Sequence, residues 1–249
     1  MVKYNILSKR LYIIHLAALT IVILIISNPL EVHAITSGIG FYSPDSLPVG
    51  AKSLEPLIGK WWNFWVNHPA SYQTNWPECL KGNGGVIGSN QSVVFLGDPA
   101  SAVENNVNAR SQKCEISSSQ ALYLTVYAGG CSKGEYPDKS IPDLLKCAQD
   151  TNKVMKLMKV KVDDQDVSNK IIRQSTSQPF IFDLPQDNVY QLKAPLVGKH
   201  PTMGESYYLF FKPLPVGHHN IELEVIRDPL EANAPVEHDV AKWDIQVVH

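Results

Sequence analysis

The chain has 249 residues, with 22 Lys and Arg against 24 Asp and Glu, so its formal net charge is −2 at pH 7. This mild, mixed charge has no basic block, which excludes the electrostatic signature of a protein that binds nucleic acid or anionic lipid. The length is sufficient for one sizeable core and falls within the range of a single β domain.

The N-terminus has the three parts of a secretory signal peptide. Three basic residues and no acidic one precede an uncharged, mostly aliphatic run of 17 residues from Leu11 to Ser27. Asn28 and Pro29 end this run, and Val32-His33-Ala34 then places small or aliphatic residues where a signal peptidase needs them. We therefore interpret residues 1–34 as a signal peptide and expect the remainder to be secreted or extracellular.

The alternative for residues 1–34 is an uncleaved membrane anchor. A run of 17 residues is at the lower edge of the roughly 17–25 that a helix needs to span a bilayer. The protein would then be anchored by this N-terminal helix, and we expect contact with a membrane through this segment alone. Under both interpretations the chain from Ile35 onward lies outside the cytoplasm.

All four cysteines lie in the part of the chain that we expect to be exported. An even number of cysteines in an oxidising compartment indicates two disulfides, for which three connectivities are possible. We predict that sequence neighbours pair, Cys79 with Cys114 and Cys131 with Cys147. The alternative is a structural zinc site, but such sites usually bring close-spaced ligand pairs, and the chain has no Cys-x-x-Cys.

One amphipathic helix is predicted after a leader at residues 35–52 that is rich in Gly, Ser and Pro. Apolar residues recur at helical spacing over Leu54–Trp65, with Ser53 placed to cap the N-terminus and Pro69 to stop the chain beyond the helix. The aromatic stripe favours a helix that is buried against a sheet. The alternative is a binding platform for sugars or another hydrophobic ligand.

Residues 70–92 are predicted to form a loop because they are rich in glycine. The glycines match neither G-x-G-x-x-G nor a P-loop, so they indicate no phosphate site. Asn90-Gln91-Ser92 is an N-glycosylation sequon, and Asn90 is therefore a candidate glycosylation site in an exported chain.

From Ser92 onward the sequence is typical of a β-rich fold. Apolar or alternating segments separated by Pro, Gly and Asp clusters predict strands at residues 93–96, 120–128, 157–162, 179–184, 207–211, 219–226 and 243–248. Ile141–Leu145 is predicted to begin a short helix, with Pro142 in its first turn. We therefore predict an all-β fold for residues 53–249, mainly an antiparallel sandwich of the jelly-roll or immunoglobulin-like type, with one or two short helices.

Three aspartates lie close together at a predicted turn, and they have two interpretations. Asp163, Asp164 and Asp166 suit a hairpin turn that is followed by a return strand from Val167. The alternative is a calcium site, since calcium favours clusters of carboxylate oxygens.

Two adjacent histidines, His218 and His219, open a predicted strand. Adjacent strand residues point to opposite faces, so we expect His219 on the apolar face as a hydrogen-bonded core histidine. His218 would share the other face with Glu222, where the alternative is a surface metal site completed by distant loops. We find no cofactor motif in the sequence, and we assign no metal ligand and no catalytic residue.

Trp61-Trp62-Asn63-Phe64-Trp65 and Tyr207–Ile221 are the longest segments of a pattern that is spread over most of the chain after residue 34. The shorter elements of this pattern are Cys79, Phe95-Leu96, Arg110, Cys114, Cys131 and Cys147. Together they resemble a family of secreted, β-rich, disulfide-bonded proteins with a Trp-rich N-terminal helix. The resemblance implies export, disulfides and a β-rich fold, and it implies no activity and no catalytic residue.

The segment Pro185–Ser206 has no strand or helix pattern. Long loops in compact domains are usually functional or mobile, and a rigid scaffold often presents its binding residues on such loops. We therefore predict the ligand-facing surface here, with Tyr190 and His200 as the contacts. The alternatives are a solvated excursion and an extra edge strand.

These observations favour a non-catalytic extracellular or envelope module, a structural or binding protein whose partner is an extracellular glycan or an envelope protein. The motifs G-x-S-x-G and H-E-x-x-H are absent, and cysteines held in disulfides offer no thiolate nucleophile. The alternative is a secreted hydrolase that acts on a polysaccharide or another polymer, whose acid and base residues come together only in the fold.

We predict that the mature protein begins at Ile35, because a helix breaker and small residues precede it at the spacing of a cleavage site. N-terminal sequencing of the native protein measures this directly. Recovery of an intact 1–34 segment in the membrane fraction would contradict cleavage and favour the anchor.

Overall fold

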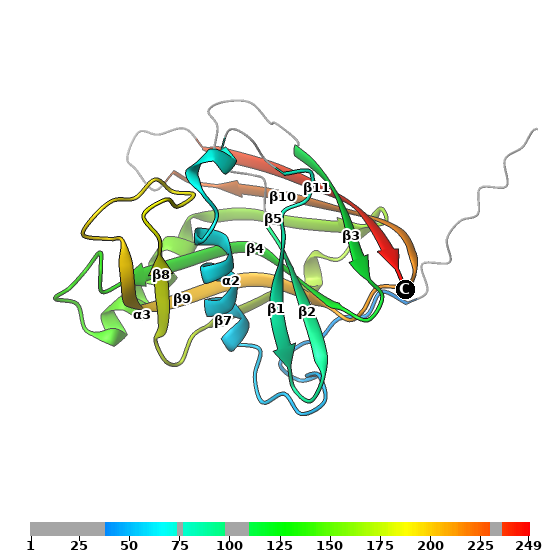
Figure 1. The fold of residues 1–249 in the computed structure, drawn as a ribbon, viewed down its shortest axis with the longest axis horizontal. Coiled ribbons are helices and arrows are strands. Elements are labelled where there is room, and N and C mark those ends of the chain that lie inside the picture. Colours follow the sequence, from blue (N-terminus) through cyan, green and yellow to red (C-terminus); the bar gives the residue numbers. More distant parts are fainter. Residues whose placement is uncertain (1–37, 74–76, 98–109, 230–235) are drawn as a thin grey trace, which may run out of the picture. The chain divides into compact units, whose positions relative to one another are not determined.

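The structure is a computed structural model that describes four stretches of the chain, residues 38–73, 77–97, 110–229 and 236–249 (Figure 1). The predicted signal peptide or anchor helix at 1–34 and the expected mature N-terminus at Ile35 lie outside these stretches. Within them, no helix combines the length and the apolar character that crossing a membrane requires.

The larger of two β-sheets has six strands in the described residues. Its main path runs β1-β2-β4-β9-β7, and β8 also pairs with β9. The pairings are antiparallel except that between β2 and β4, which is parallel. The bounds are β1 Lys81–Ile87, β2 Gln91–Leu96, β4 Ala121–Ser132, β7 Ile172–Ser175, β8 Phe180–Leu184 and β9 Gly198–Phe211.

The smaller sheet has five strands in the order β3-β11-β10-β5-β6. Here β3 runs parallel to β11 and the other pairings are antiparallel. The bounds are β3 Arg110–Ser117, β5 Met155–Val162, β6 Gln165–Asp166, β10 Gly217–Arg227 and β11 Glu237–Val248. The helices are α2 Pro56–Val66 and α3 Ile141–Thr151, with 3₁₀ segments η1 Ala70–Gln73, η2 Asn152–Val154 and η3 Ser168–Lys170.

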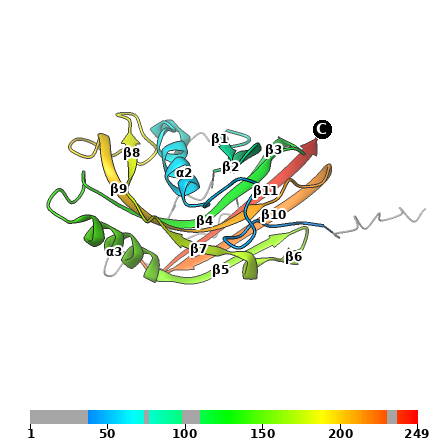
Figure 2. The ribbon, with the colours of Figure 1, turned by 90° about the horizontal axis from the view of Figure 1, so that it is seen from below.

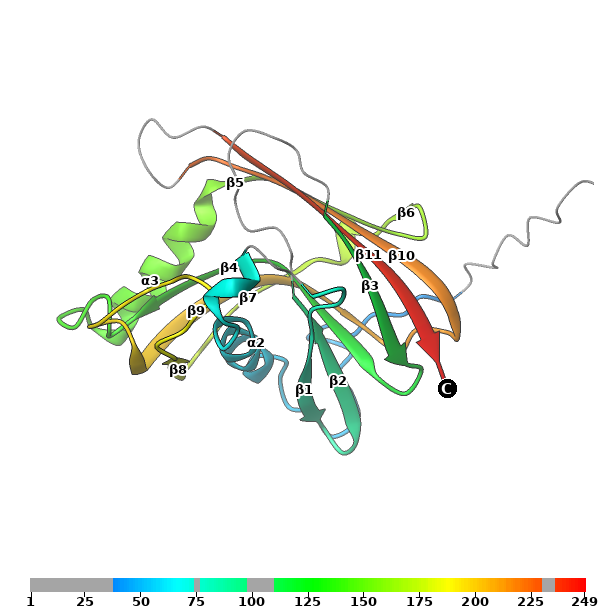
Figure 3. The same ribbon diagram turned by 45° about the horizontal axis from the view of Figure 1, so that its top comes forward.

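Both faces of the larger sheet are covered. Figures 2 and 3 show α2 on one side of β4 and β9, with β5, β10 and β11 on the other. Residues 121–126 of β4 are buried without interruption, because Leu122 and Leu124 face the smaller sheet whereas Tyr123 faces α2. The prediction of a mostly β protein with two packed sheets is confirmed, and the jelly-roll or immunoglobulin-like type stays a prediction.

Helix α2 is buried against the larger sheet, as the apolar spacing predicts. Leu57, Trp61 and Trp65 lie in one core cluster with Phe95 and Tyr123 of the sheet. The rings of Trp61 and Trp65, one helical turn apart, stack with an interplanar angle of 2°. The helix ends at Val66, before the predicted stop.

The sequence predicts the helix N-cap at Ser53, which is two residues before the N-cap in the structure, Glu55. The helix begins at Pro56, which suits a first turn because proline has no N–H to leave unpaired. Glu55 therefore takes the cap position, but its carboxylate accepts hydrogen bonds from the backbone N and Oγ of Ser177 at 2.5 and 3.0 Å instead of capping the helix. Ser53 Oγ accepts a hydrogen bond from Glu55 N at 3.0 Å.

Helix α3 begins as predicted and extends further, to Thr151. Ser140 and Asp143 form a reciprocal capping box, and Pro142 lies in the first turn. The C-terminal end of α3 is attached to the larger sheet beside Glu205, a residue that is 3% exposed. The Glu205 carboxylate accepts hydrogen bonds from three side chains. These donors are Asn152 Nδ2 at 3.1 Å, Arg173 Nη2 at 2.9 Å and Ser175 Oγ at 2.7 Å.

The region 70–92, predicted as a loop, contains η1 and β1 and leads into β2. Its glycines conceal the alternation of a strand because they have no side chain to show which face is buried. The register between β1 and β2 shifts between Asn83 and Gly85, and Gly85 has a φ of +78°, which glycine adopts without strain.

Two further strands, β3 and β7, were not predicted. The alternation of β3 is hidden because the polar Gln112 is buried, where its Oε1 accepts a hydrogen bond from Leu80 N at 2.7 Å. The return strand expected from Val167 is also wrong, since β6 ends at Asp166 and a 3₁₀ turn follows.

The leader is part of the fold from Gly38 onward. Tyr42 N donates to Phe210 O at 2.7 Å, and Lys212 N donates to Gly40 O at 2.9 Å, so this segment pairs with the end of β9. The short connection between the end of β9 at Phe211 and the start of β10 at Gly217 carries the chain from the larger sheet to the smaller sheet.

His219 is the hydrogen-bonded core histidine that the strand pattern predicts. Its residue is 8% exposed, its Nδ1 lies 2.8 Å from Asp163 Oδ2, and its Nε2 lies 3.0 Å from Pro215 O. Asp163 and Asp164 have positive φ, as the predicted hairpin turn requires, and Asp163 Oδ1 accepts from Asn220 N at 2.8 Å. These contacts give Asp163 a structural role.

The disulfides pair sequence neighbours, Cys79 with Cys114 and Cys131 with Cys147, which confirms the predicted connectivity. The first ties the segment before β1 to β3, and the second ties the end of β4 to α3. Two disulfides suggest that the protein resides in an oxidising environment.

We predict that removing the Cys131–Cys147 bond with paired serine substitutions lowers the free energy of unfolding by about 3 kcal/mol. Removing the Cys79–Cys114 bond should lower it by about 4 kcal/mol, because Cys79–Cys114 closes the longer loop. Chemical denaturation of each double variant against the wild type measures both values. A larger loss from Cys131–Cys147 would contradict the loop-length argument.

Candidate ligand-binding cavity

A cavity of about 700 Å³ lies beside α2 at the end of the larger sheet where β8 meets β9. Its walls come from α2, β4, β8, β9 and the two loops that follow β4 and β8. The loop after β8 is the yellow segment between β8 and β9 in Figure 1. The lining residues are Trp62, Gly130, Ser132, Glu135, Phe182, Leu184, Tyr190, Leu192, Leu196 and Thr202.

Aromatic rings from separate elements form one part of the wall. The rings of Trp62 and Phe182 are 6.0 Å apart between centroids and meet edge to face at 82°. Gly130 makes room for the indole, since a Cβ there would lie 3.3 Å from Trp62 Cζ2. Tyr190 OH accepts a hydrogen bond from Trp65 Nε1 at 2.9 Å, which positions the third ring.

The indole N–H of Trp62 is a polar group that the fold does not satisfy. Its Nε1 is buried and has no hydrogen-bond partner in the part of the chain that the structure describes. An unpaired buried donor costs about 1–3 kcal/mol. Trp62 lines the cavity through its ring, whereas its Nε1 is packed beside Gly130, where an added Cβ would lie 3.7 Å from it.

A buried amide holds the loop that carries Tyr190. Asn188 is 0% exposed, and its Nδ2 donates to Pro185 O and Leu192 O, both at 2.9 Å. Its Oδ1 accepts from Leu192 N at 3.0 Å. One side chain therefore closes the loop upon itself, so the loop forms a defined wall with Leu192 facing the cavity.

The rim on the other side is polar. Ser132 N and Oγ donate to Glu135 Oε2 at 3.1 and 3.0 Å, and Glu135 N donates back to Ser132 Oγ at 3.2 Å. These bonds fix an exposed carboxylate at the mouth of the cavity. Thr202 adds a hydroxyl, which donates to His200 O at 3.1 Å.

The two residues that the sequence singles out occupy different places. Tyr190 lies in the loop and lines the cavity, whereas His200 lies on β9 opposite Phe182 and does not line it. The predicted loop Pro185–Ser206 ends at Val197, because β9 begins at Gly198. Its second half extends the strand predicted at 207–211 and pairs with β4 and β8, so it is not the extra edge strand of the alternative. The ring of His200 instead packs against Gly134, where an added Cβ would lie 2.8 Å from it.

The sequence gives no sign of Glu135 as a cavity residue and points to Trp62 only through the alternative of an aromatic binding platform. Trp62 follows Trp61 directly and therefore points to a different side of the helix. Glu135 belongs to a polar segment, and nothing in its pattern marks one carboxylate among several. Asn90, the glycosylation candidate, is exposed in the turn between β1 and β2, and its use stays a prediction.

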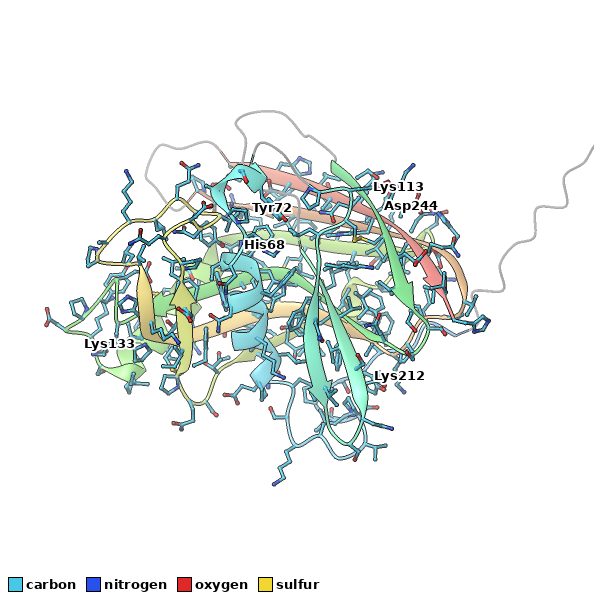
Figure 4. All side chains as sticks on the ribbon, viewed as in Figure 1. His68, Tyr72, Lys113, Lys133, Lys212 and Asp244 are labelled. Carbon is cyan, nitrogen blue, oxygen red and sulfur yellow. A yellow bond between two sulfur atoms is a disulfide. The ribbon has the colours of Figure 1, made fainter. Side chains whose placement is uncertain are left out.

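A second hollow of about 640 Å³ lies between α2 and β1. Its polar groups are largely engaged within the fold, because Lys60 Nζ donates to Gly84 O at 3.3 Å and Asn63 Nδ2 donates to Ile181 O at 2.8 Å. At the end of α2, His68 packs against Phe64 and Tyr72 (Figure 4). Burial lowers the pKa of His68, which favours the neutral ring.

Metal binding has no candidate among the described residues. No group of three or more His, Cys, Asp or Glu side chains there is arranged to hold an ion. His218 Nε2 instead contacts Asp244 Oδ1, and Glu222 pairs with Lys242 at 2.5 Å. Asp166 accepts a hydrogen bond from Ser168 N at 2.9 Å.

Comparison with known proteins adds little. No protein-family model matches the sequence, and no curated protein is similar enough to count as a relative. Among solved structures, the cysteine protease inhibitor EhICP2 from Entamoeba histolytica is 13% identical, with 56% of this chain and 88% of that chain covered and a TM-score of 0.23. PbICP-C, solved in complex with falcipain-2, is 12% identical, with 63% and 98% covered and a TM-score of 0.25. Likenesses with TM-scores this low carry no argument about the fold or function of this chain.

We predict that Asn188→Ala lowers the free energy of unfolding by about 1–3 kcal/mol, because it leaves buried backbone groups of the loop unpaired. It should also speed proteolytic cleavage within residues 185–197. Denaturation and limited proteolysis measure the two effects, with the exposed neighbour Gln186→Ala as the control. Equal behaviour of the two variants would show that Asn188 does not hold the loop.

Proposed function

We propose that the chain is a non-catalytic binding module that acts outside the cytoplasm and holds a compact amphipathic group in the cavity beside α2. The observation that carries the proposal is a cavity of about 700 Å³ whose wall joins aromatic and leucine side chains to a few polar ones, Ser132, Glu135 and Thr202. Small-molecule sites characteristically combine apolar walls with a few placed polar groups, and they span about 300–1,000 Å³.

The lining fixes the kind of group that would fit. Phe182, Leu184, Leu192 and Leu196 offer apolar surface for the body of a ligand, while Ser132 and Glu135 offer polar contacts at the mouth. A sugar residue of an extracellular glycan has this character, since its ring carries an apolar C–H face and hydroxyls at the edge. An envelope component with a similar terminal group is equally suited.

The alternative of a polymer hydrolase receives less support from this cavity. Glycoside hydrolysis uses two carboxyl groups, about 5–9 Å apart, on either side of the scissile bond. Among the described residues that line the cavity, Glu135 supplies the only carboxylate. The site therefore offers a place to bind and no acid–base pair.

We predict that Tyr190→Ala weakens binding of any ligand of this cavity about tenfold or more, because loss of an aromatic contact and its positioning bond costs at least about 1.4 kcal/mol. Tryptophan fluorescence during titration with soluble oligosaccharides and small envelope components measures the affinity. The matched control is Tyr136→Ala, which removes an exposed tyrosine outside the cavity.

Binding that survives Tyr190→Ala unchanged would place the ligand elsewhere and contradict the proposal. Hydrolysis of an oligosaccharide by the purified wild-type protein, lost in Glu135→Gln, would replace the binding function by a catalytic one.

A further inference from the structure

We propose that the ligand of this cavity carries an ammonium group, which the Glu135 carboxylate and the aromatic faces of the wall recognise together. This inference rests on the proposed function, because it concerns the same cavity. It narrows the ligand from a compact amphipathic group to an organic cation that also bears a hydrogen-bond acceptor.

The first support is the charge of the lining. Of the described residues that line the cavity, Glu135 is the only one with a formal charge. The lysines nearest to it in sequence are engaged in their own loop, because Lys133 Nζ donates to Pro137 O at 2.9 Å and Lys139 Nζ lies 4.1 Å from the centre of the Tyr136 ring. Figure 4 shows Lys133 in this loop, at the end of the sheet.

A further lysine near the cavity has a carboxylate partner. Lys199 Nζ, at the start of β9, lies 3.4 Å from Asp183 Oδ2 on the paired strand β8. The one formal charge among the described lining residues is therefore that of Glu135, and beside this carboxylate a cation is favoured over an anion.

The second support is the way Glu135 is held. Both hydrogen bonds from Ser132 go to Oε2, and Ser132 itself is 4% exposed. This arrangement holds the carboxylate through one oxygen, and these bonds leave Oε1 available. A carboxylate fixed in this way loses little side-chain entropy when it binds, in contrast to a freely rotating surface glutamate.

The third support is the aromatic wall. Trp62, Phe182 and Tyr190 approach the cavity from a helix, a strand and a loop. Their π faces attract cations, tryptophan most strongly, and quaternary ammonium ligands are commonly recognised by such groups of rings. An ammonium surrounded by methyl or methylene groups satisfies the rings and the neighbouring leucines at once.

The polar part of the lining adds a second requirement. Ser132, Glu135 and Thr202 bring hydrogen-bonding side chains to the cavity, so an oxygen within a few bonds of the ligand's nitrogen would find partners there. Amino alcohols and amino sugars have both groups at this separation. The proposed ligand is therefore an organic ammonium with a nearby hydroxyl.

The test uses two probes of the same shape, choline and 3,3-dimethylbutan-1-ol, in which a neutral carbon replaces the ammonium nitrogen. We expect the wild-type protein to bind choline about tenfold more tightly, since a cation beside aromatic faces gains on the order of a factor of ten. Glu135→Gln should reduce this preference about threefold, as suits an exposed ion pair.

The matched control for Glu135→Gln is Asp138→Asn, which removes an equal charge from the same exposed loop outside the cavity lining. Isothermal titration calorimetry measures both probes on all three proteins, and thermal denaturation checks that each variant is folded. A choline preference that falls equally in both variants would reflect the general charge of the loop and would overturn the role of Glu135.

The ammonium inference and the proposed function fail in different ways. The ammonium inference is overturned if the two probes bind with equal affinity. It is also overturned if a neutral oligosaccharide binds in a way that depends on Tyr190 while choline does not bind. Neither result contradicts the proposed binding function of the cavity. If ligand binding persists unchanged in both Tyr190→Ala and Glu135→Gln, the ammonium inference and the proposed function are both overturned.

Discussion

Burial of both faces of the larger sheet is the constraint that the rest of the fold satisfies. The central strands β4 and β9 carry large apolar side chains on each side, and leaving one face in water would cost about 25 cal/mol for each Å² of apolar surface. The smaller sheet covers one face through Leu122 and Leu124, and α2 covers the other through Trp61 and Trp65. The cover by α2 keeps Tyr123 and Phe95 away from solvent.

The cavity arises where this cover ends. Helix α2 has 11 residues, and Trp62, at the edge of its buried face, is met by the loop after β8 and by the loop after β4. A sheet interior filled by fixed side chains leaves no room for a ligand, whereas the junction of a helix and two loops does. The site is thus a consequence of covering a long sheet with a short helix.

The sequence predicts the elements whose pattern is strong and misses those whose pattern depends on a distant partner. The alternation around Leu124 identifies β4, and the helical spacing of Leu57 and Trp61 identifies α2. By contrast, β3 is stabilised as a strand by its parallel neighbour β11, which lies more than 120 residues later in the chain. The buried Gln112 of β3 acquires its partners only in the folded protein, so no local pattern could reveal it.

The same distinction applies to the candidate site. Tyr190 was predicted from an unusually long loop, and that signal is local. His200 was predicted with it and does not line the cavity, because β9 starts two residues earlier and sets the histidine on a paired strand. Trp62 and Glu135 are 73 positions apart, so their meeting is a property of the topology and is invisible in either segment alone.

The Cys131–Cys147 disulfide connects the site to the compartment in which the protein folds. Cys131 lies on β4 between two lining residues, Gly130 and Ser132, and the bond closes the loop that carries Glu135. Without the disulfide, this loop is tied to the sheet at its β4 end, through α3, and through Lys133 N, which donates to Pro201 O of β9 at 2.9 Å. Oxidation adds a covalent restraint on the other side, and restraint of a binding loop before the ligand arrives lowers the entropy cost of binding. The binding proposed for this cavity is therefore expected to be stronger when the disulfide is formed, even though no cysteine is among the described lining residues.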